Sequence, residues 1–393
     1  MKKILIYSIA YHPFIGGAEI AIKEITDRIA VSEVEFDLIT LRFDKKLPKF
    51  ERIGNINVYR IGFTKSNPTM TDLVSFPMYL NKVFFPFTAS FKGLSLHRIR
   101  KYDAQWSMMS YMGFPALFFS WFKRVPIILT LQEGDTISHI TSRLRIRLVY
   151  HFYKMIFKKA SLIQVISNYL GKFARDMGYK GETVLVPNGV DVSFFTHEYG
   201  EQELGALRWQ FHKEEGDIFL VTTSRLVVKN GVADVISALV LLPENIKFLI
   251  LGIGPLEESL KKLVSDLGLE KRVIFAGFVD NKDTPKYLKI SDIFIRPSLS
   301  EGMGISFIEA MAAGIPVIAT SVGGIPDFLK ENETGLFCEV NNPESIAKSV
   351  HKLLDNPELR QKIVLNASKM VAKDYDWDHI TKQMKDSVFT KIC

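Results

Sequence analysis

Short apolar runs alternate with longer helical patterns along the whole chain. In the first half we predict strands at Ile4–Ser8, Phe36–Leu41, Asn57–Ile61, Val125–Leu131, Leu162–Ile166 and Thr183–Val186. In the second half we predict strands at Ile218–Thr223, Lys247–Leu251, Val273–Ala276, Asp292–Ile295 and Pro316–Ala319. Short buried strands that alternate with helices are typical of parallel α/β sheets. The pattern therefore predicts two successive α/β layers.

A turn-rich segment, Pro187–Asp191, separates the two series of strands, and an irregular polar stretch follows it to Gly216. A chain of 393 residues is long enough for two domains with their own cores. We predict domains at residues 1–190 and 191–376 and a carboxyl-terminal helix at 377–393. The carboxyl ends of both sheets would then face a shared cleft, where such sheets usually bind ligands.

Composition indicates an ordinary globular protein, with 47% hydrophobic and 24% charged residues. Cys338 and Cys393 provide neither a disulfide framework nor a metal-ligand spacing, so a reducing cytoplasm is the expected compartment. The start of the chain, with Lys2 and Lys3 before ILIYSIAY, imitates a signal peptide in part. Its apolar run is short and no cleavage site follows, so we interpret it as the first strand.

Charge is distributed unevenly: residues 1–190 carry 27 Lys and Arg against 14 Asp and Glu. Between Thr64 and Gln132 the acidic residues are Asp72 and Asp103, and the same segment is rich in Phe and Trp. Aromatic and basic residues mixed in this way suit a lipid headgroup interface. We therefore expect a peripheral position at the anionic inner face of a membrane, without a transmembrane helix and without a nucleic-acid partner.

Six of these basic residues lie in the segment 143–159, RLRIRLVYHFYKMIFKK. It fits a basic amphipathic helix at a membrane surface or a lid over an anionic acceptor. A core-packed helix with a solvated basic face fits equally well.

Two carboxylates, Glu301 and Glu309, flank a glycine-containing turn in the segment 298–327, SLSEGMGISFIEAMAAGIPVIATSVGGIPD. The turn follows a predicted strand and precedes a helix that begins near Ile305. Glycines allow backbone amides to approach a ligand closely, and a helix N-terminus favours phosphate. The arrangement predicts a site for a charged ligand that carries a sugar.

This segment resembles the signature of glycosyltransferase family 4, in which two glutamates separated by seven residues bind a nucleotide sugar. The resemblance implies that Glu309 holds the ribose hydroxyls and that Glu301 holds the transferred sugar. It also implies that the diphosphate meets the backbone of Gly302, Met303, Gly304 and Ile305. The likeness extends from Gly16 to Asp378 and implies the GT-B fold, two Rossmann-like domains facing a central cleft.

Arg225 and Lys229 follow the first strand of the second half, where strand ends point into the predicted cleft. Preorganised cations there would stabilise the charge that grows on a departing diphosphate. The family usually has Lys directly before the glycine, whereas this chain has Asn230 in that place and Lys229 before it. A surface pair at a helix start is the alternative for these two cations.

The resemblance identifies further candidates. Gly16, Gly17, Gly254 and Val279 match donor-binding turns of the family. Gln132, Glu133 and Asp135 lie where many relatives carry a His, and they are candidates for acceptor hydroxyls or ordinary loop residues. No HExxH pair is present, and we predict neither a metal site nor a cofactor.

The sequence therefore predicts a retaining, metal-independent glycosyltransferase. The expected donor is a nucleotide diphosphate sugar, and the expected acceptor is a saccharide or lipid-linked saccharide in cell-surface polysaccharide or glycolipid synthesis. A nucleotide-sugar epimerase, a glycoside hydrolase using Glu301 and Glu309 as its acid pair, and a non-catalytic binding subunit are the alternatives.

Overall fold

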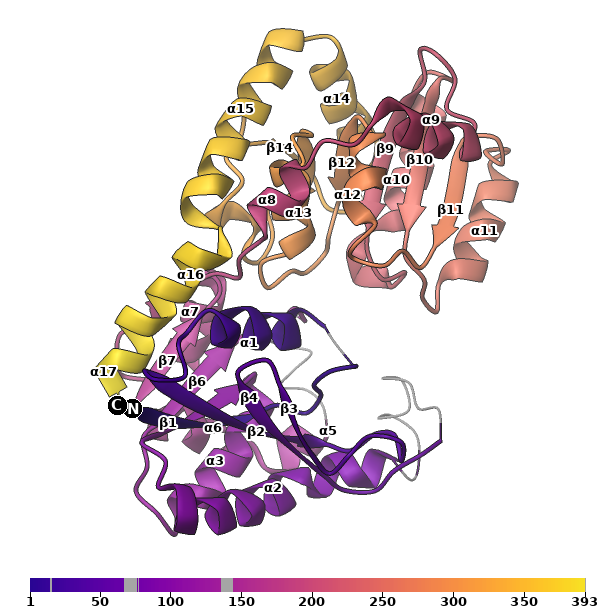
Figure 1. Cartoon of the computed structure of the whole chain (residues 1–393). Helices are drawn as coiled ribbons and strands as arrows, with labels where there is room; N and C mark the ends of the chain where they lie inside the picture. The colour runs from indigo at the N-terminus through magenta and orange to yellow at the C-terminus, as the bar shows by residue number, and fades with distance from the viewer. Residues whose placement is uncertain (15, 67–75, 77, 136–143, 393) are drawn as a thin grey trace. The chain divides into compact units, whose positions relative to one another are not determined.

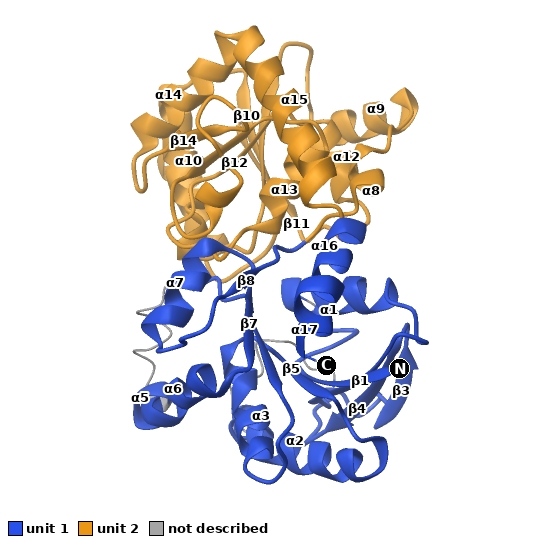
Figure 2. Ribbon diagram, turned by 90° about the vertical axis from the view of Figure 1, so that its left-hand side faces the viewer, with its two compact units in different colours: residues 1–188, 377–393 blue, residues 189–376 orange. Residues whose placement is uncertain are grey.

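The computed structural model describes residues 1–14, 16–66, 76, 78–135 and 144–392. The chain forms two compact units, residues 1–188 with 377–393 and residues 189–376 (Figure 2). The sequence placed the boundary after residue 190, and in the structure the first unit ends at Asn188. Both units are parallel-sheet α/β domains, which confirms the predicted fold class.

The sheet of the first unit has the strand order β3-β4-β2-β1-β5-β6-β7-β8 among the described residues (Figure 1). Its strands are β1 Lys2–Tyr7, β2 Val34–Leu41, β3 Phe50–Ile53, β4 Ile56–Ile61, β5 Ala104–Met108, β6 Ile127–Leu131, β7 Leu162–Val165 and β8 Val184–Leu185. Neighbouring strands are parallel except for the β3–β4 pair.

Helices cover both faces of this sheet (Figure 1). They are α1 Gly17–Asp27, α2 Met78–Arg100, α3 Gly113–Ser120, α5 Leu144–Leu148, α6 Tyr150–Lys159, α7 Asn168–Asp176, α16 Trp377–Met384 and α17 Thr390–Ile392. Because side chains alternate along a strand, Ile4 and Ile6 of β1 pack with α1 and α16. Leu5 and Tyr7 pack on the opposite face with α2 and α3.

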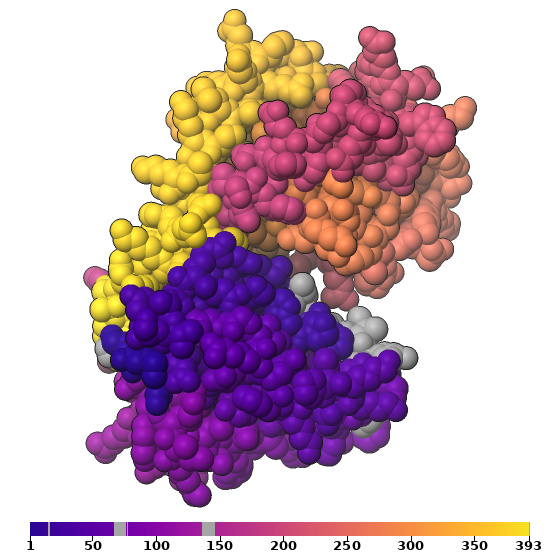
Figure 3. All heavy atoms as spheres, in the orientation of Figure 1, coloured from indigo at the N-terminus to yellow at the C-terminus, as the bar shows by residue number. Residues whose placement is uncertain are grey.

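The carboxyl-terminal segment belongs to the first unit although it follows the second along the chain. Trp377 and Phe389 are buried in the same core as Ile4 and Ile22. Arg28 also donates to Asp378 at 2.9 Å. In the space-filling view this segment, in yellow, lies directly against the indigo amino-terminal residues (Figure 3). Apolar burial and ion pairs therefore hold it in place.

The second unit has the strand order β11-β10-β9-β12-β13-β14, all parallel. Its strands are β9 Ile218–Thr223, β10 Ile246–Leu251, β11 Val273–Gly277, β12 Ile293–Arg296, β13 Val317–Thr320 and β14 Leu336–Cys338. Its helices are α8 Val192–Thr196, α9 Glu201–Gln210, α10 Val232–Ala238, α11 Glu257–Asp266, α12 Thr284–Lys289, α13 Ile305–Ala312, α14 Pro343–Leu354 and α15 Pro357–Asp374. Strand order reverses between β9 and β12, which is the topological switch point where open α/β sheets bind ligands.

Each predicted strand is present with its bounds shifted by no more than two residues, and β3, β5 and β14 were not predicted. The stretch from residue 192 to residue 216 was expected to be irregular, but it contains α8 and α9. The basic segment 143–159 forms two helices, α5 and α6, which meet at Val149, and Arg143 lies outside the described residues. Across the described part of the chain, every helix is too short or too polar to cross a membrane.

Candidate active site

The loops after β9 and β12 lie side by side at the switch point of the second unit. The backbone N–H of Leu299 donates to the carbonyl oxygen of Lys229 at 2.7 Å. Gly231 has φ of 66°, and a Cβ added there would lie 2.2 Å from the carbonyl oxygen of Pro297. Only glycine permits this close approach. The predicted cations and the predicted glutamates are thus brought to the same edge of one sheet.

Glu301 lies on the loop between β12 and α13, as the sequence predicted. Its Oε2 accepts a hydrogen bond from Nη2 of Arg296 at 2.8 Å, and its Oε1 accepts one from the N–H of Gly302 at 3.1 Å. Its carbonyl oxygen accepts from the N–H of Gly324 at 3.1 Å. The side chain is 14% exposed. Glu301 is therefore fixed in position while its side chain remains partly accessible.

Arg296, the last residue of β12, is a site residue that the sequence analysis missed. It is buried, and its Nη1 donates to Oγ of Ser306 at 2.7 Å. Its guanidinium lies 4.2 Å from the ring centroid of Phe307. Burial lowers the pKa of Arg296, and the charges of Glu301 and Glu309 oppose that shift. A charged residue directly after the apolar run Ile293–Ile295 was the signal that could have revealed it.

Glu309 lies in the second turn of α13, also as predicted. Burial raises its pKa to about 7, and the positive charge of Arg296 opposes the rise. Among the residues that the structure describes, no side chain donates a hydrogen bond to its carboxylate. A half-buried carboxylate without such a donor is suited to accept a hydrogen bond from a ligand hydroxyl.

The glycine turn before α13 depends on backbone shape. Gly304 has φ of 87° and is the N-cap of the helix. A Cβ added there would lie 2.5 Å from Cδ2 of Phe307 and 2.9 Å from Nη2 of Arg296. The side chain of Met303 is buried, so its contribution to a ligand would come from the backbone, as for Gly302 and Ile305. The first turn of α13 also has the positive end of the helix dipole.

Arg225 and Lys229 lie on the loop after β9, where Arg225 is exposed and Lys229 half-buried. The side chain of Asn230 is buried and donates to the carbonyl oxygen of Arg225 at 2.6 Å. The residue that replaces the family's usual Lys therefore shapes this loop instead of presenting a charge to it.

The loop after β10 packs against the loop after β9. The N–H of Leu226 donates to the carbonyl oxygen of Ile253 at 3.1 Å. A Cβ at Gly254 would lie 2.4 Å from the carbonyl oxygen of Leu226, so this glycine permits close packing of two loops. Val279, after β11, is half-buried beside the exposed Phe278. Gly254 and Val279, the two predicted residues, therefore lie at the same edge of the sheet as Glu301.

In the first unit, Gly17 is the first residue of α1 and Gly16 is its N-cap. The N–H of Gly16 donates to Oε2 of Glu19 at 2.8 Å, and Ser8 donates to the other oxygen of this carboxylate. Burial raises the pKa of Glu19. The diglycine turn is therefore held by a buried carboxylate that the sequence analysis did not single out.

The three predicted acceptor residues differ in their surroundings. Gln132 exchanges two hydrogen bonds with the side chain of Asn188, at 3.1 and 3.2 Å. Glu133 is buried, accepts from the N–H of Ser110 at 2.6 Å, and has one oxygen without a partner among the described residues. Burial raises its pKa. Asp135 is half-buried. Glu133 therefore contacts the loop after β5 rather than open solvent.

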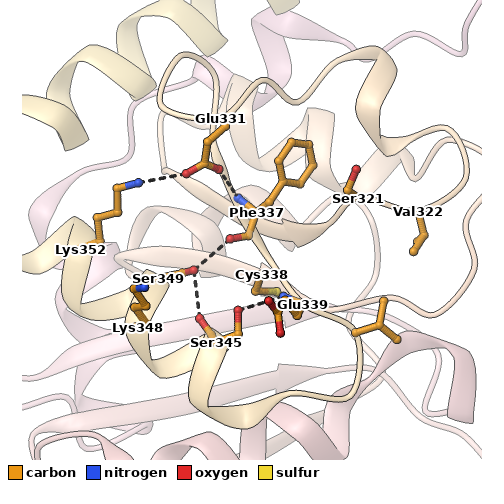
Figure 4. Close-up of a pocket in the computed structure, with 11 residues that line it drawn as sticks. Ser321, Val322, Glu331, Phe337, Cys338, Glu339, Ser345, Lys348, Ser349 and Lys352 are labelled. Atoms are coloured by element: carbon orange, nitrogen blue, oxygen red, sulfur yellow. Dashed lines mark hydrogen bonds and ion pairs between the residues drawn. The ribbon is translucent and has the colours of Figure 1, made fainter.

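A separate cavity of about 540 Å³ lies beyond β13 and β14 in the second unit (Figure 4). Glu331 accepts there from Nζ of Lys352 at 3.0 Å and from the N–H of Phe337 at 2.7 Å. The buried thiol of Cys338 lines the same cavity. None of the predicted site residues lines it. Over the described ranges, no three His, Cys, Asp or Glu side chains come together as a metal-binding group.

Comparison with known families matches both halves of the chain. Residues 15–194 match the family described as Glycosyltransferase Family 4, and residues 205–370 match the family described as Glycosyl transferases group 1. An uncharacterized glycosyltransferase of Methanocaldococcus jannaschii is 27% identical over 391 residues, which are 97% of this chain and 96% of that protein. A GDP-mannose-dependent alpha-(1-6)-phosphatidylinositol monomannoside mannosyltransferase of Mycobacterium tuberculosis is 29% identical over 57% of this chain and 60% of that protein.

Solved structures resemble the whole chain. The sucrose-phosphate synthase of Thermosynechococcus elongatus has a TM-score of 0.83 at 20% identity and covers 100% of this chain and 99% of its own. Anabaena HepE in complex with UDP-glucose has a TM-score of 0.77 at 20% identity and covers 99% of this chain and 100% of its own. From the two family matches and this fold, the chain belongs to the glycosyltransferases of family 4, with the GT-B fold.

Proposed function

We propose that the protein transfers a hexosyl group from a nucleoside diphosphate sugar to a saccharide or lipid-linked saccharide, with retention of configuration and without a metal ion. One observation carries the proposal: Glu301, fixed by Arg296, and Glu309 lie on either side of the glycine turn at the switch point. The complex of HepE with UDP-glucose, in a similar fold, supports this class of donor.

In this proposal Glu309 accepts hydrogen bonds from the ribose hydroxyls, and Glu301 accepts them from hydroxyls of the transferred sugar. The backbone N–H groups of Gly302 to Ile305 face the diphosphate. Arg225 and Lys229 stabilise the negative charge that grows as the glycosidic bond to phosphate breaks. The amides and the two cations supply positive charge where many enzymes would use a metal ion.

The configuration is retained because the acceptor attacks the anomeric carbon on the same face from which the diphosphate leaves. The acceptor oxygen forms its bond to the anomeric carbon as the bond to the diphosphate oxygen breaks. That diphosphate oxygen takes the proton of the acceptor hydroxyl, so no protein base is needed. None of the residues assigned to the site acts as a covalent nucleophile, and Glu301 instead orients the sugar for this step.

We propose the chemical class of the acceptor from the named relatives and from the charge of the first unit. The mycobacterial relative is named for a phosphatidylinositol monomannoside, a glycolipid. Residues 1–190 are strongly basic. Both support an anionic or lipid-linked acceptor that is met at the cytoplasmic face of a membrane, with Gln132 and Asp135 as candidate contacts to its hydroxyls.

The site favours sugar transfer over the two other reactions considered for it, epimerisation of a nucleotide sugar and hydrolysis of a glycoside. An epimerase would consume the donor without any acceptor, and the matched families and the named relatives support transfer instead. A glycoside hydrolase needs one carboxylic acid and one free carboxylate at the scissile bond. The ion pair of Glu301 with Arg296 and the phosphate-favouring turn beside it do not suit that chemistry.

A thermal-shift panel of nucleoside diphosphates tests the donor class, because a ligand that binds the folded state raises its stability. We expect one nucleoside diphosphate to raise the melting temperature without added metal and in the presence of a chelator. The Glu309→Gln variant should lose this shift. A panel without any shift, or a shift that requires a divalent ion, would contradict the proposal.

A further inference from the structure

Helix α2 exposes a stripe of large apolar side chains on the first unit. Leu80, Phe84, Phe87 and Phe91 follow one another at intervals of four, three and four residues, so they lie on one face of the helix. They are 37%, 53%, 49% and 65% exposed. The opposite face of α2, with Phe85, is already packed in the core. The stripe is therefore additional to the apolar surface that the fold needs.

The stripe continues across the neighbouring helices. The ring of Phe87 stacks on Phe118 of α3 with centroids 4.6 Å apart, and Phe118 lies 5.0 Å from Trp121. Trp121 lies 6.3 Å from Phe152 of α6. We call Phe84, Phe87, Phe91, Phe118, Trp121 and Phe152 the aromatic face. It spans three helices, and a continuous apolar surface of this kind usually marks an interface.

An apolar groove of about 620 Å³ lies at one end of the aromatic face. Its lining consists of four phenylalanines, one glycine and two polar residues: Phe63, Phe84, Phe87, Phe91, Gly62, Asn81 and Thr88. Its lining offers few polar groups, so its shape and chemistry suit a hydrocarbon chain rather than a sugar.

The surroundings of the aromatic face are basic. Helices α2, α3, α5 and α6 contain no Asp or Glu. Lys123 and Arg124, directly after Trp121 and Phe122, are exposed, and so are Lys158 and Lys159 at the end of α6. An apolar surface framed by cations matches a membrane with anionic headgroups, where aromatic side chains insert and cations meet phosphates.

We propose that the aromatic face docks the first unit on an anionic membrane surface. A second copy of the chain fits this face less well, because two such faces would bring like charges together. The proposal deepens the proposed function by naming the surface that presents a lipid-linked acceptor. Docking itself requires no sugar transfer, so the two can fail separately.

Vesicle sedimentation tests the docking with the full chain. We expect binding to vesicles of 30% phosphatidylglycerol in phosphatidylcholine, weaker binding to pure phosphatidylcholine, and a decrease at high salt. Because Phe84 and Phe91 are largely exposed, Phe84→Ser with Phe91→Ser should leave the fold intact and weaken binding about tenfold or more. Trp209, on α9 of the second unit, is a still more exposed aromatic at 80%, so Trp209→Ser is the control and should bind normally.

Tryptophan fluorescence locates the contact. In Trp209→Phe the remaining tryptophans are Trp106 and Trp377, both buried, and Trp121, which is 55% exposed. We expect the emission of Trp121 to shift to the blue and to be quenched by brominated lipids when anionic vesicles are added.

Vesicle binding that is absent, or equal in the double variant and the wild-type protein, would overturn the proposal. A dimer that the double variant disrupts would assign this face to a second copy instead. Nucleoside diphosphate thermal shifts on the same variants report separately on the proposed function.

Discussion

Nη2 of Arg296 and Oε2 of Glu301 lie 2.8 Å apart, and this ion pair joins the end of β12 to the loop that begins the predicted donor site. Its side chains are 7% and 14% exposed. Removing either partner of a buried ion pair lowers stability, because it leaves the other charge buried and unpaired. The pair therefore fixes the position of Glu301 before any sugar arrives, and it also places a positive charge near Glu309.

Replacing Arg296 should change the pH dependence of donor binding. If Glu309 binds ribose as a carboxylate, wild-type affinity falls as the pH drops through about 7. Arg296→Met removes the charge that opposes the raised pKa of Glu309, so the midpoint should move to higher pH. Titration of nucleoside diphosphate binding between pH 5.5 and about 9, with circular dichroism to check folding, measures this shift. An unchanged midpoint would show that Arg296 does not act on Glu309.

Glu309→Gln should stabilise the protein selectively at alkaline pH. Since burial raises the pKa of Glu309 to about 7, the folded state binds the proton more tightly than the unfolded chain does. That stability is complete below the ordinary value of 4.5 and is lost as the pH rises to about 7. Gln cannot ionise, so the variant should gain about 2 kcal/mol relative to wild type between pH 5 and pH 8. Urea unfolding at the two pH values measures this gain, and an equal difference at both would refute it.

Arg225→Ala should slow sugar transfer without loss of stability. The side chain is exposed, so its removal should change the free energy of unfolding by less than about 0.5 kcal/mol. Loss of one cation that stabilises the leaving diphosphate should lower kcat about a hundredfold or more. Lys262→Ala, an exposed cation on α11, is the control and should transfer at the wild-type rate. If Arg225→Ala also matches wild type, this cation takes no part in the reaction.

Alanine variants of two glycines with positive φ, Gly304 and Gly314, distinguish the effect of backbone strain from that of a steric clash. Gly304 has φ of 87° and Gly314 has φ of 81°, but only the former has a neighbour within 4 Å of an added Cβ. Both alanine variants should lose about 1 kcal/mol of stability from strain. Gly304→Ala should lose more, and it should also lose donor binding because Phe307 and Arg296 must move. Equal thermal shifts with nucleotide in both variants would argue against a donor site at this turn.

Continuous apolar runs made most strands predictable, because strands of parallel sheets are buried on both faces. Strand β5 was missed because its run, AQWSM, contains Gln105 and Ser107. Both are buried, and the neighbouring Trp106 donates from Nε1 to Oγ1 of Thr130 at 2.8 Å. Polar residues that are buried within a strand interrupt the apolar run by which a strand is recognised in a sequence.

The loops of the candidate site were predictable because their glycines and charges follow predicted strands directly. The interactions between those loops were not. Arg296 directly follows the predicted strand Asp292–Ile295 and was not singled out, since its partners Glu301 and Ser306 become apparent only when the loop folds back. Glu133 was chosen as a polar loop residue, but its bond to Ser110 depends on a neighbouring strand end that the sequence does not place.

The most direct measurement is a crystal structure with a nucleoside diphosphate bound. We expect the ribose hydroxyls within hydrogen-bond distance of Glu309 and the diphosphate against the N–H groups of Gly302 to Ile305, with Arg225 or Lys229 on its oxygens. A nucleotide whose diphosphate lies away from the β9–β12 switch point would contradict the account.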